Sequence, residues 1–424
     1  MNGSSASVAA RAPTDWKGTA MQRRIARRYA AERRFRWTGL AAILTSGGFL
    51  AFLLVSMLLS GARGFTRTEI ALPIDFPRSA VMVDPAALAL GNPEQALANA
   101  NLPAAIDQAA KAAFGPEGAS LIAPGAVRAV GRAIVADPAI LDRKATIAVP
   151  ASEAIDVAAK GKGTPAAEAA AARLKAHGAL STRFNGAFLT GSDGTDATQV
   201  GIWGAFKGSL LTMAVTLLLS FPIGVLAALY LEEYAPRNRW TDMIEVSINN
   251  LAAVPSIIFG LLGLAIFLNV MHLPRSAPLV GGMTLALMTM PVIVIAGRNA
   301  IKAVPPSIRD AALGIGASPV QVVFHHVLPL ALPGILTGTI IGMARALGET
   351  APLLMIGMRA FIASPPGGVT DPATVLPVQI FLWSDEVGRG FIEKTSAAII
   401  VLLAFLLAMN GLAIYLRNKF EKRW

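Results

Sequence analysis

Residues 310–333 read DAALGIGASPVQVVFHHVLPLALP, a polar segment punctuated by glycine and proline. Apolar stretches near 279–297 and 334–356 flank it, and each is about long enough to cross the ~30 Å hydrocarbon core of a membrane. A chain that is mostly lipid-soluble has little reason to hold such a segment between two spans unless a protein outside the membrane binds it. The segment therefore predicts a membrane protein with a docking loop.

The predicted loop, 305–333, contains signals for two short helices. Ser307 and Asp310 have the S-x-x-D spacing of a capping box, which predicts a helix start. Gly316 predicts the end of that helix, and Ser318 followed by proline predicts the start of a second one. We expect two helices set at an angle, forming a compact knob that fits a groove on a partner.

The composition of the whole chain agrees with a membrane protein. Its mean hydropathy is +0.56, and only 15% of its residues are charged. The chain has no cysteine, which excludes disulfides and thiolate metal sites. We predict an all-α integral membrane protein with six transmembrane helices. They are expected near 38–60, 208–230, 251–271, 279–297, 334–356 and 396–416.

The distribution of positive charge predicts the orientation. Residues 1–37 carry nine basic and two acidic side chains, and residues 417–424 carry four and one. Because basic ends stay in the cytoplasm, both termini, including the tail 418–424, are expected there. The insert 61–203 is then periplasmic, and the loops near 231–250 and 298–333 are cytoplasmic. The amino-terminal arginines are interpreted as this topology signal, with no nucleic-acid partner.

The insert is predicted to be an α-rich, possibly α+β, domain. Its alanine content favours helices, and its β-branched stretches fit strands or buried helices equally well. Phe188 and Trp203 are expected at the level of the lipid headgroups. The sequence assigns the insert no role. The helical candidates are 103–114 and 165–180, the ambiguous stretches are 121–135 and 146–149, and flexible ends are expected near 61–80 and 181–200.

A charged pair lies inside the fifth predicted span. Arg345 and Glu349 are four residues apart, on one face of a helix. Counted from residue 334, Arg345 is roughly 16 Å along the span and close to its middle. Charge at that depth is costly, so it usually faces a bundle interior or an aqueous path. Two interpretations stay open: a structural ion pair, or a guanidinium that binds a tetrahedral oxyanion.

Several stretches resemble a known family. Residues 344–354, ARALGETAPLL, are similar to a span of the PstA permeases of phosphate ABC importers. Residues 220–236 and 254–267, SFPIGVLAALYLEEYAP and VPSIIFGLLGLAIF, also resemble that family. The 305–333 loop resembles its EAA coupling loop, with Asp310 where Glu is usual and His326 where an aliphatic residue is usual. The residues that the resemblance assigns to ATPase coupling are Asp310, Ala311, Ala312, Gly316, Ser318, Leu328 and Pro329.

The resemblance implies an ABC type I importer permease core over 204–417. It places Arg345, Glu349 and Thr350 in an anion path. A second arginine is often found in the span before the coupling loop, but Ile295 stands at that place here. Arg298 is therefore a weaker candidate, and an interfacial position suits it better.

The implied function is that of a permease subunit of an ATP-driven phosphate importer in the bacterial inner membrane. The chain has no G-x-x-x-x-G-K-[ST] phosphate loop, so it is not expected to be an enzyme. ATP and Mg²⁺ are expected on a separate ATPase dimer, and this chain is expected to bind no cofactor. The other expected partners are a second homologous permease, a periplasmic phosphate-binding protein, phosphate and membrane lipid.

Two alternatives remain from the sequence. One is an ABC permease for another oxyanion, such as sulfate or molybdate, which would share the coupling loop. The other is a membrane-anchored sensor or scaffold that works through the insert. Deleting residues 70–190 is expected to separate them, since a transporter would keep its uptake and a sensor would lose its function.

Overall fold

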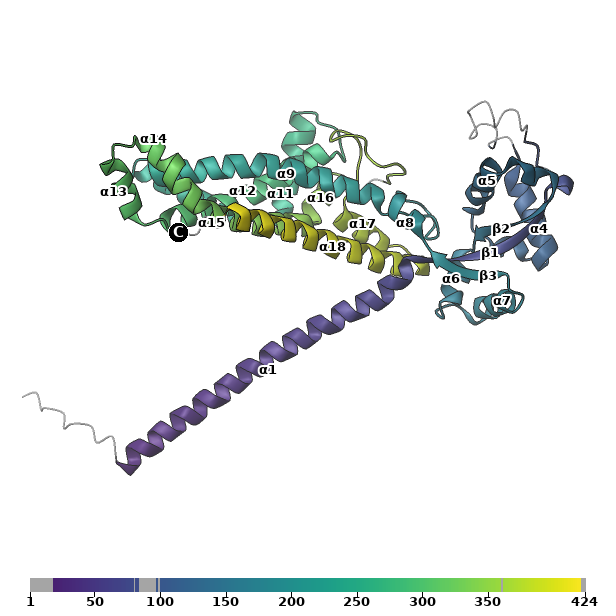
Figure 1. Ribbon diagram of the computed structural model, residues 1–424, viewed down its shortest axis with the longest axis horizontal. Coiled ribbons are helices and arrows are strands. Elements are labelled where there is room, and N and C mark those ends of the chain that lie inside the picture. The colour runs from purple at the N-terminus through teal and green to yellow at the C-terminus, as the bar shows by residue number, and fades with distance from the viewer. Residues whose placement is uncertain (1–17, 80, 84–96, 98–99, 360, 421–424) are drawn as a thin grey trace, which may run out of the picture. The chain divides into compact units, whose positions relative to one another are not determined.

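The structure is a computed structural model that describes residues 18–79, 81–83, 97, 100–359 and 361–420 (Figure 1). The chain divides into two units, residues 1–57 and 58–424, which are described separately. Predictions that fall on residues 1–17 and 421–424 lie outside the described residues.

The first unit contains most of the helix α1 (Thr19–Gly64). This helix begins well before the predicted apolar span at residue 38. The difference arises because the preceding segment is rich in arginine and alanine, which are good helix formers. The end of α1, from Leu58 onward, belongs to the second unit.

The insert is an α+β domain built on a small antiparallel sheet. Its three strands, β1 (Thr66–Asp75), β2 (Lys144–Pro150) and β3 (Leu180–Phe184), lie in the order β2-β1-β3. The prediction of flexible residues near 61–80 was wrong, because the central strand lies there. Ile70, Leu72 and Ile74 alternate along β1 and are fully buried, as expected for one face of a strand.

Helices cover that buried face of the sheet. Alanine-rich helices lie where they were predicted, whereas the ambiguous 121–135 stretch is mainly helical and 146–149 belongs to a strand. The helices and short helical turns of the insert are η1 (Phe76–Arg78), α4 (Leu102–Phe114), η2 (Gly118–Leu121), α5 (Ala126–Ala136), η3 (Pro138–Asp142), α6 (Glu153–Ala159), α7 (Pro165–Ala176) and α8 (Gly186–Thr190).

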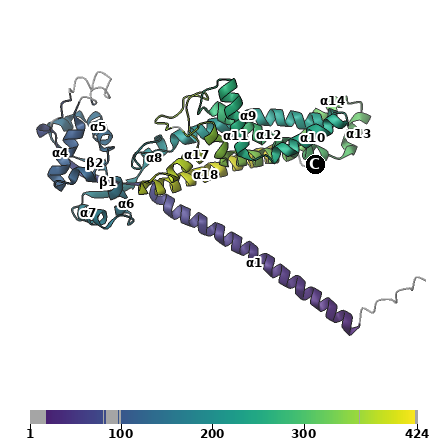
Figure 2. The same cartoon turned by 180° about the vertical axis from the view of Figure 1, so that it is seen from behind.

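Four long helices form the centre of the membrane part. They are α9 (Trp203–Leu229), α12 (Pro278–Lys302), α15 (Leu328–Gly348) and α18 (Arg389–Phe420). The helix α12 packs against α9 (Figure 2). It also packs against α15, which in turn packs against α18. With α1, five described helices are long and apolar enough to cross a membrane. The predicted all-α architecture is confirmed for the described residues of this part of the chain.

The sixth apolar segment is sharply bent. The helix α10 (Arg239–Ala252) is followed by α11 (Ser256–Gly263) and the π-helical η5 (Leu264–Val270), with a bend of 101° between the two halves. The predicted loop at 231–250 is therefore mostly helix. Asn238 begins it, because its side-chain oxygen accepts hydrogen bonds from Trp240 N and Thr241 N, both at 3.0 Å.

Shorter elements complete the membrane part. The π-helical η4 (Tyr230–Tyr234) extends α9, and η6 (Val322–Val327), also π-helical, leads into α15. Such segments are rare and frequently mark functional sites. The remaining helices are α13 (Pro306–Gly314), α14 (Pro319–Gln321), α16 (Ala351–Met355) and α17 (Leu376–Ser384).

Candidate functional site: the coupling loop and the Arg345–Glu349 pair

The loop between α12 and α15 forms the predicted pair of short helices, α13 and α14. Gly316 separates them with φ +90°. Its N–H donates to Leu313 O at 3.0 Å, and Ala317 N donates to Ala312 O at 3.1 Å. These two bonds form a Schellman motif, which uses a left-handed glycine to end a helix. The turn is therefore set by a backbone conformation that side-chain-bearing residues rarely adopt.

The two predicted caps had different outcomes. The Ser318 capping box is confirmed, since Ser318 N donates to Gln321 Oε1 at 2.9 Å and Gln321 N donates to Ser318 Oγ at 3.3 Å. The cap at Ser307 was wrong, because α13 begins at Pro306 with Pro305 before it, so Ser307 lies inside the helix. The rings of Pro305 and Pro306 fix φ at a value that suits the first turn of a helix. The helix α13 therefore starts without a side-chain cap.

The knob has a buried side and an exposed side. Ala312 is buried against the ends of the membrane helices, whereas Asp310, Ala311 and Gly316 are exposed. Leu328 and Pro329 are half-buried at the start of α15. The exposed side also carries large apolar side chains, which is typical of a surface that binds another protein. These are Leu313, Ile315, Val320 and Phe324, with Ile315 82% exposed.

Arg309 holds this knob to the membrane helices, and the sequence did not reveal it. Its guanidinium donates to Glu233 Oε1 from Nη2 at 2.6 Å and to Val304 O from Nη1 at 2.7 Å. Nη2 also donates to Ile301 O at 3.1 Å. One side chain thus binds carbonyls at the end of α12 and just after it, and joins α13 to the acid of η4. Arg309 and Glu233 are 76 residues apart, so no local pattern links them.

We expect Arg309→Lys to loosen the knob. An ammonium keeps the charge but lacks the planar fork that binds the carboxylate and both carbonyls together. The expected cost is about 2 kcal/mol of stability, in the range for hydrogen bonds to charged groups. Thermal unfolding of the purified complex should show a lower Tm, with Arg309→Met lower still. A Tm for Arg309→Lys equal to that of the wild type would contradict the clamp.

Arg298 lies in a separate cluster of charges. Its Nη2 donates to Glu245 at 2.9 Å, and its Nε lies 3.4 Å from Glu232. Lys302 Nζ is 3.6 Å from the same Glu232 oxygen. The Arg298 guanidinium is thus engaged by two acids from η4 and α10. The interfacial position expected for Arg298 stays a prediction, since these ion pairs do not show on which side of a membrane the cluster lies.

The register of α12 and α15 separates Arg298 from Arg345. A Cβ at Gly334 would meet Ala300, and one at Gly342 would meet Thr289, so the two helices run antiparallel. Arg298 therefore lies near the level of residue 336 on α15. Arg345 is nine residues farther along, roughly 13 Å at 1.5 Å per residue. The structure does not bring the two arginines into one site.

The Arg345–Glu349 pair lies at the end of α15. Arg345 Nε is 3.4 Å from Glu349 Oε1, and their side chains are 47% and 20% exposed. Thr350 follows in the break between α15 and α16. Arg345 is about half-exposed, and an arginine that faced lipid would be costly. Its free side is expected to meet another subunit or an aqueous path.

The predicted continuous span 334–356 was wrong in its bounds. The helix α15 starts at Leu328 and ends at Gly348, before the short α16. Pro352 explains the break, because it has no N–H to donate to Gly348 O and its ring would collide with that carbonyl. Arg345 is thus roughly 26 Å along α15 and three residues from its end. A charged pair at the end of an interrupted helix suits a site that binds ions.

Two known families match separate parts of the chain. Residues 220–423 match the family described as "Binding-protein-dependent transport system inner membrane component". Residues 22–169 match a "Domain of unknown function (DUF3333)". The two matches leave the residues between them unassigned.

Three relatives of this chain are named as permeases. The probable ABC transporter permease protein YqgI of Bacillus subtilis is 30% identical over 55% of this chain and 84% of its own length. The phosphate transport system permease protein PstA of Haemophilus influenzae is 31% identical over 50% and 73%, respectively. PstA 1 of Mycobacterium tuberculosis is 33% identical over 37% of this chain and 51% of its own length.

Proposed function

This chain belongs to the PstA family of phosphate ABC-importer permeases, and from that premise we propose that it forms half of the path of an ATP-driven phosphate importer. It is a multi-pass inner-membrane permease and not an enzyme. The observation that carries the phosphate assignment is the similarity to permeases named for phosphate transport, over about half of the chain.

The coupling loop is the proposed contact with the ATPase. Its exposed apolar side chains and its tight glycine turn form a rigid surface, while Arg309 connects that surface to η4 and α12. A displacement of the knob by the ATPase would therefore move η4 and the end of α12 with it. Contact with a cytoplasmic ATPase requires the loop and both termini to be cytoplasmic, and the insert 61–203 to be periplasmic.

Arg345 is the proposed contact with the anion. Its half-exposed guanidinium offers donors in a fork that matches two oxygens of a phosphate group. Glu349 would orient the guanidinium and weaken the hold on the anion enough for release. We propose that the other side of the path comes from a second, homologous permease, and that a periplasmic binding protein delivers the phosphate.

The test is uptake of phosphate by cells that lack their own high-affinity importer and receive this chain with its partner subunits. We expect ATP-dependent phosphate uptake that an excess of sulfate or molybdate leaves unchanged. Suppression by either competitor would transfer the assignment to another oxyanion. Absence of uptake, with the partner subunits shown to be assembled, would overturn the proposed function.

A further inference from the structure

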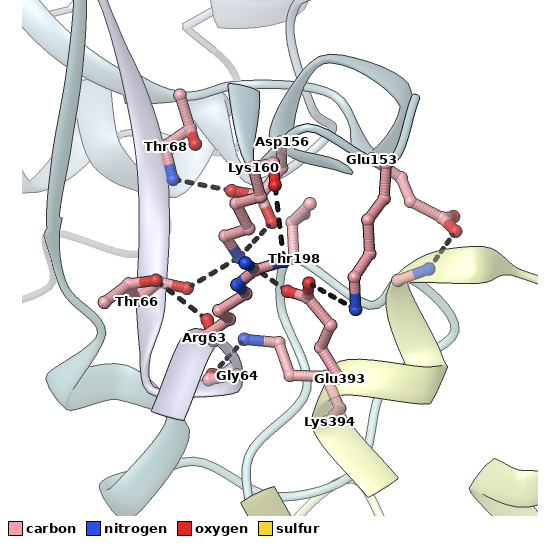
Figure 3. A network of polar contacts seen from close by, with 12 residues as sticks. Arg63, Gly64, Thr66, Thr68, Glu153, Asp156, Lys160, Thr198, Glu393 and Lys394 are labelled. Carbon is pink, nitrogen blue, oxygen red and sulfur yellow. Dashed lines mark hydrogen bonds and ion pairs between the residues drawn. The ribbon is translucent and has the colours of Figure 1, made fainter. Parts of the chain in front are cut away.

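The first turns of α18 carry two charged side chains that are buried against the insert (Figure 3). Glu393 and Lys394 are 4% and 3% exposed. Glu393 Oε2 lies 3.1 Å from the Nζ of Lys160, which belongs to the insert. The same Nζ lies 2.8 Å from Asp156 Oδ2. One lysine of the insert thus bridges an acid of its own domain and an acid of a membrane helix.

The insert also caps the beginning of α18. The first N–H groups of a helix have no partner within the helix. Gly390 N donates to Glu153 Oε1 of the insert at 2.7 Å. A carboxylate in that position is also favoured by the helix dipole. The start of α18 is therefore completed by a side chain located 237 residues earlier in the chain.

Lys394 connects α18 to the end of α1. Its Nζ donates to Gly64 O at 2.7 Å and lies 5.2 Å from the centre of the Phe188 ring. Phe188 was expected at the headgroup level, but it is fully buried here. A Cβ at Gly64 would come within 2.3 Å of Glu393 O, so the two backbones touch. This approach tolerates only glycine at position 64.

Two acids and two lysines are buried at this place: Asp156, Glu393, Lys160 and Lys394. Two further bonds to strand β1 support them: Thr68 N donates to Asp156 Oδ1 at 2.8 Å, and Lys160 Nζ donates to Thr66 O at 3.2 Å. Buried charge is tolerated when it is paired and hydrogen-bonded, and removal of one partner is strongly unfavourable. We call this set the junction cluster. It consists of Asp156, Lys160, Glu393 and Lys394.

We infer that the insert is a fixed extension of α18 and moves with it as one body during transport. The contacts come from charge pairing, helix capping and close backbone packing, three independent kinds of interaction at one place. The helix α18 packs against α15, which carries Arg345. A shift of α15 and α18 would thereby reach the periplasmic surface through the insert. Glu393 and Lys394 are positioning residues in this arrangement.

The test measures a distance within the assembled complex. The chain has no cysteine, so Glu168→Cys in the insert and Ile392→Cys in α18 allow specific spin labels at two exposed positions. We expect the same narrow distance distribution in the resting complex and in a complex trapped with a non-hydrolysable ATP analogue. A shifted or broad distribution in the otherwise wild-type chain would overturn the inference. Because this readout requires no transported anion, it stands even if the substrate is not phosphate.

Variants of the junction cluster test whether its contacts hold the insert to α18. We expect Glu393→Gln to broaden the distribution and to lower uptake roughly tenfold, since it removes the acid of α18 that pairs with the buried Lys160. We expect Lys394→Met to act in the same direction, since it removes the hydrogen bond to Gly64 O at the end of α1. Asp137→Asn is the matched control, because it breaks an exposed pair with Arg143 in the same domain. Single variants that behave like this control would contradict the role of the cluster.

Discussion

Gly316→Val is expected to lower coupled transport at least tenfold while the protein remains in the membrane. At φ +90° a β-branched side chain is strained by roughly 1–3 kcal/mol. Relief of that strain requires the Schellman turn to open, which changes the angle between α13 and α14. The exposed apolar side chains of the knob would then no longer present one surface. In proteoliposomes, both phosphate uptake and substrate-stimulated ATP hydrolysis should fall at least tenfold, roughly the ratio that 1.4 kcal/mol produces.

Gly314→Ala is the matched control for this variant. Both glycines are exposed, and a Cβ at either would meet no atom within 4 Å among the described residues. The left-handed φ occurs at Gly316, whereas Gly314 is the last residue of α13. We expect Gly314→Ala to keep nearly full uptake, since alanine favours helix. Equal losses in the two variants would show that surface shape, and not the turn, causes the defect.

Arg345→Gln is expected to lower phosphate uptake by roughly 10- to 100-fold. The estimate corresponds to the loss of one hydrogen-bonded contact to a charged group, about 1.5–3 kcal/mol. Arg345→Lys keeps the charge but not the fork, and should retain an intermediate rate. Initial uptake rates, normalised to the amount of protein in the membrane, measure both. Arg417→Gln makes the same change near the far end of α18 and serves as the control.

A double variant separates the two interpretations of the Arg345–Glu349 pair. If the pair only neutralises itself, Arg345→Gln with Glu349→Gln should transport nearly as well as the wild type, because no unpaired charge remains. If Arg345 binds the anion, the double variant should stay as defective as Arg345→Gln alone. Recovery of uptake in the double variant would therefore remove Arg345 from the proposed path.

Local patterns predicted the local features of this protein. The Ser318 capping box involves residues three positions apart, and its two hydrogen bonds are present as the spacing indicated. The turn at Gly316 follows in the same way from its residue type. The break at Pro352 has an equally local signal, the missing N–H of proline, although the apolar run continues across it. The alternation of Ile70, Leu72 and Ile74 is the pattern of a strand, in a stretch that was expected to be flexible.

Long-range partners could not be read from the sequence. Arg309 and Glu233 meet only because α9 and α12 pack together and bring η4 beside α13. Glu393 and Lys394 come just before the predicted span 396–416, at a position where exposed charge is ordinary. Their burial depends on a domain more than 200 positions earlier. Charge patterns predict which side of a membrane a segment occupies, but pairing requires the folded arrangement.

The junction cluster also defines which parts of this protein can be exchanged between relatives. The two family matches, 22–169 and 220–423, suggest that the chain can be cut between them. The folded unit extends across that boundary, since Glu153 and Lys160 of the insert bind residues in the first turns of α18. A truncation of 70–190 would remove these partners along with the sheet. A useful chimera or deletion must therefore replace residues 389–394 together with the insert, as one graft made from two distant pieces of sequence.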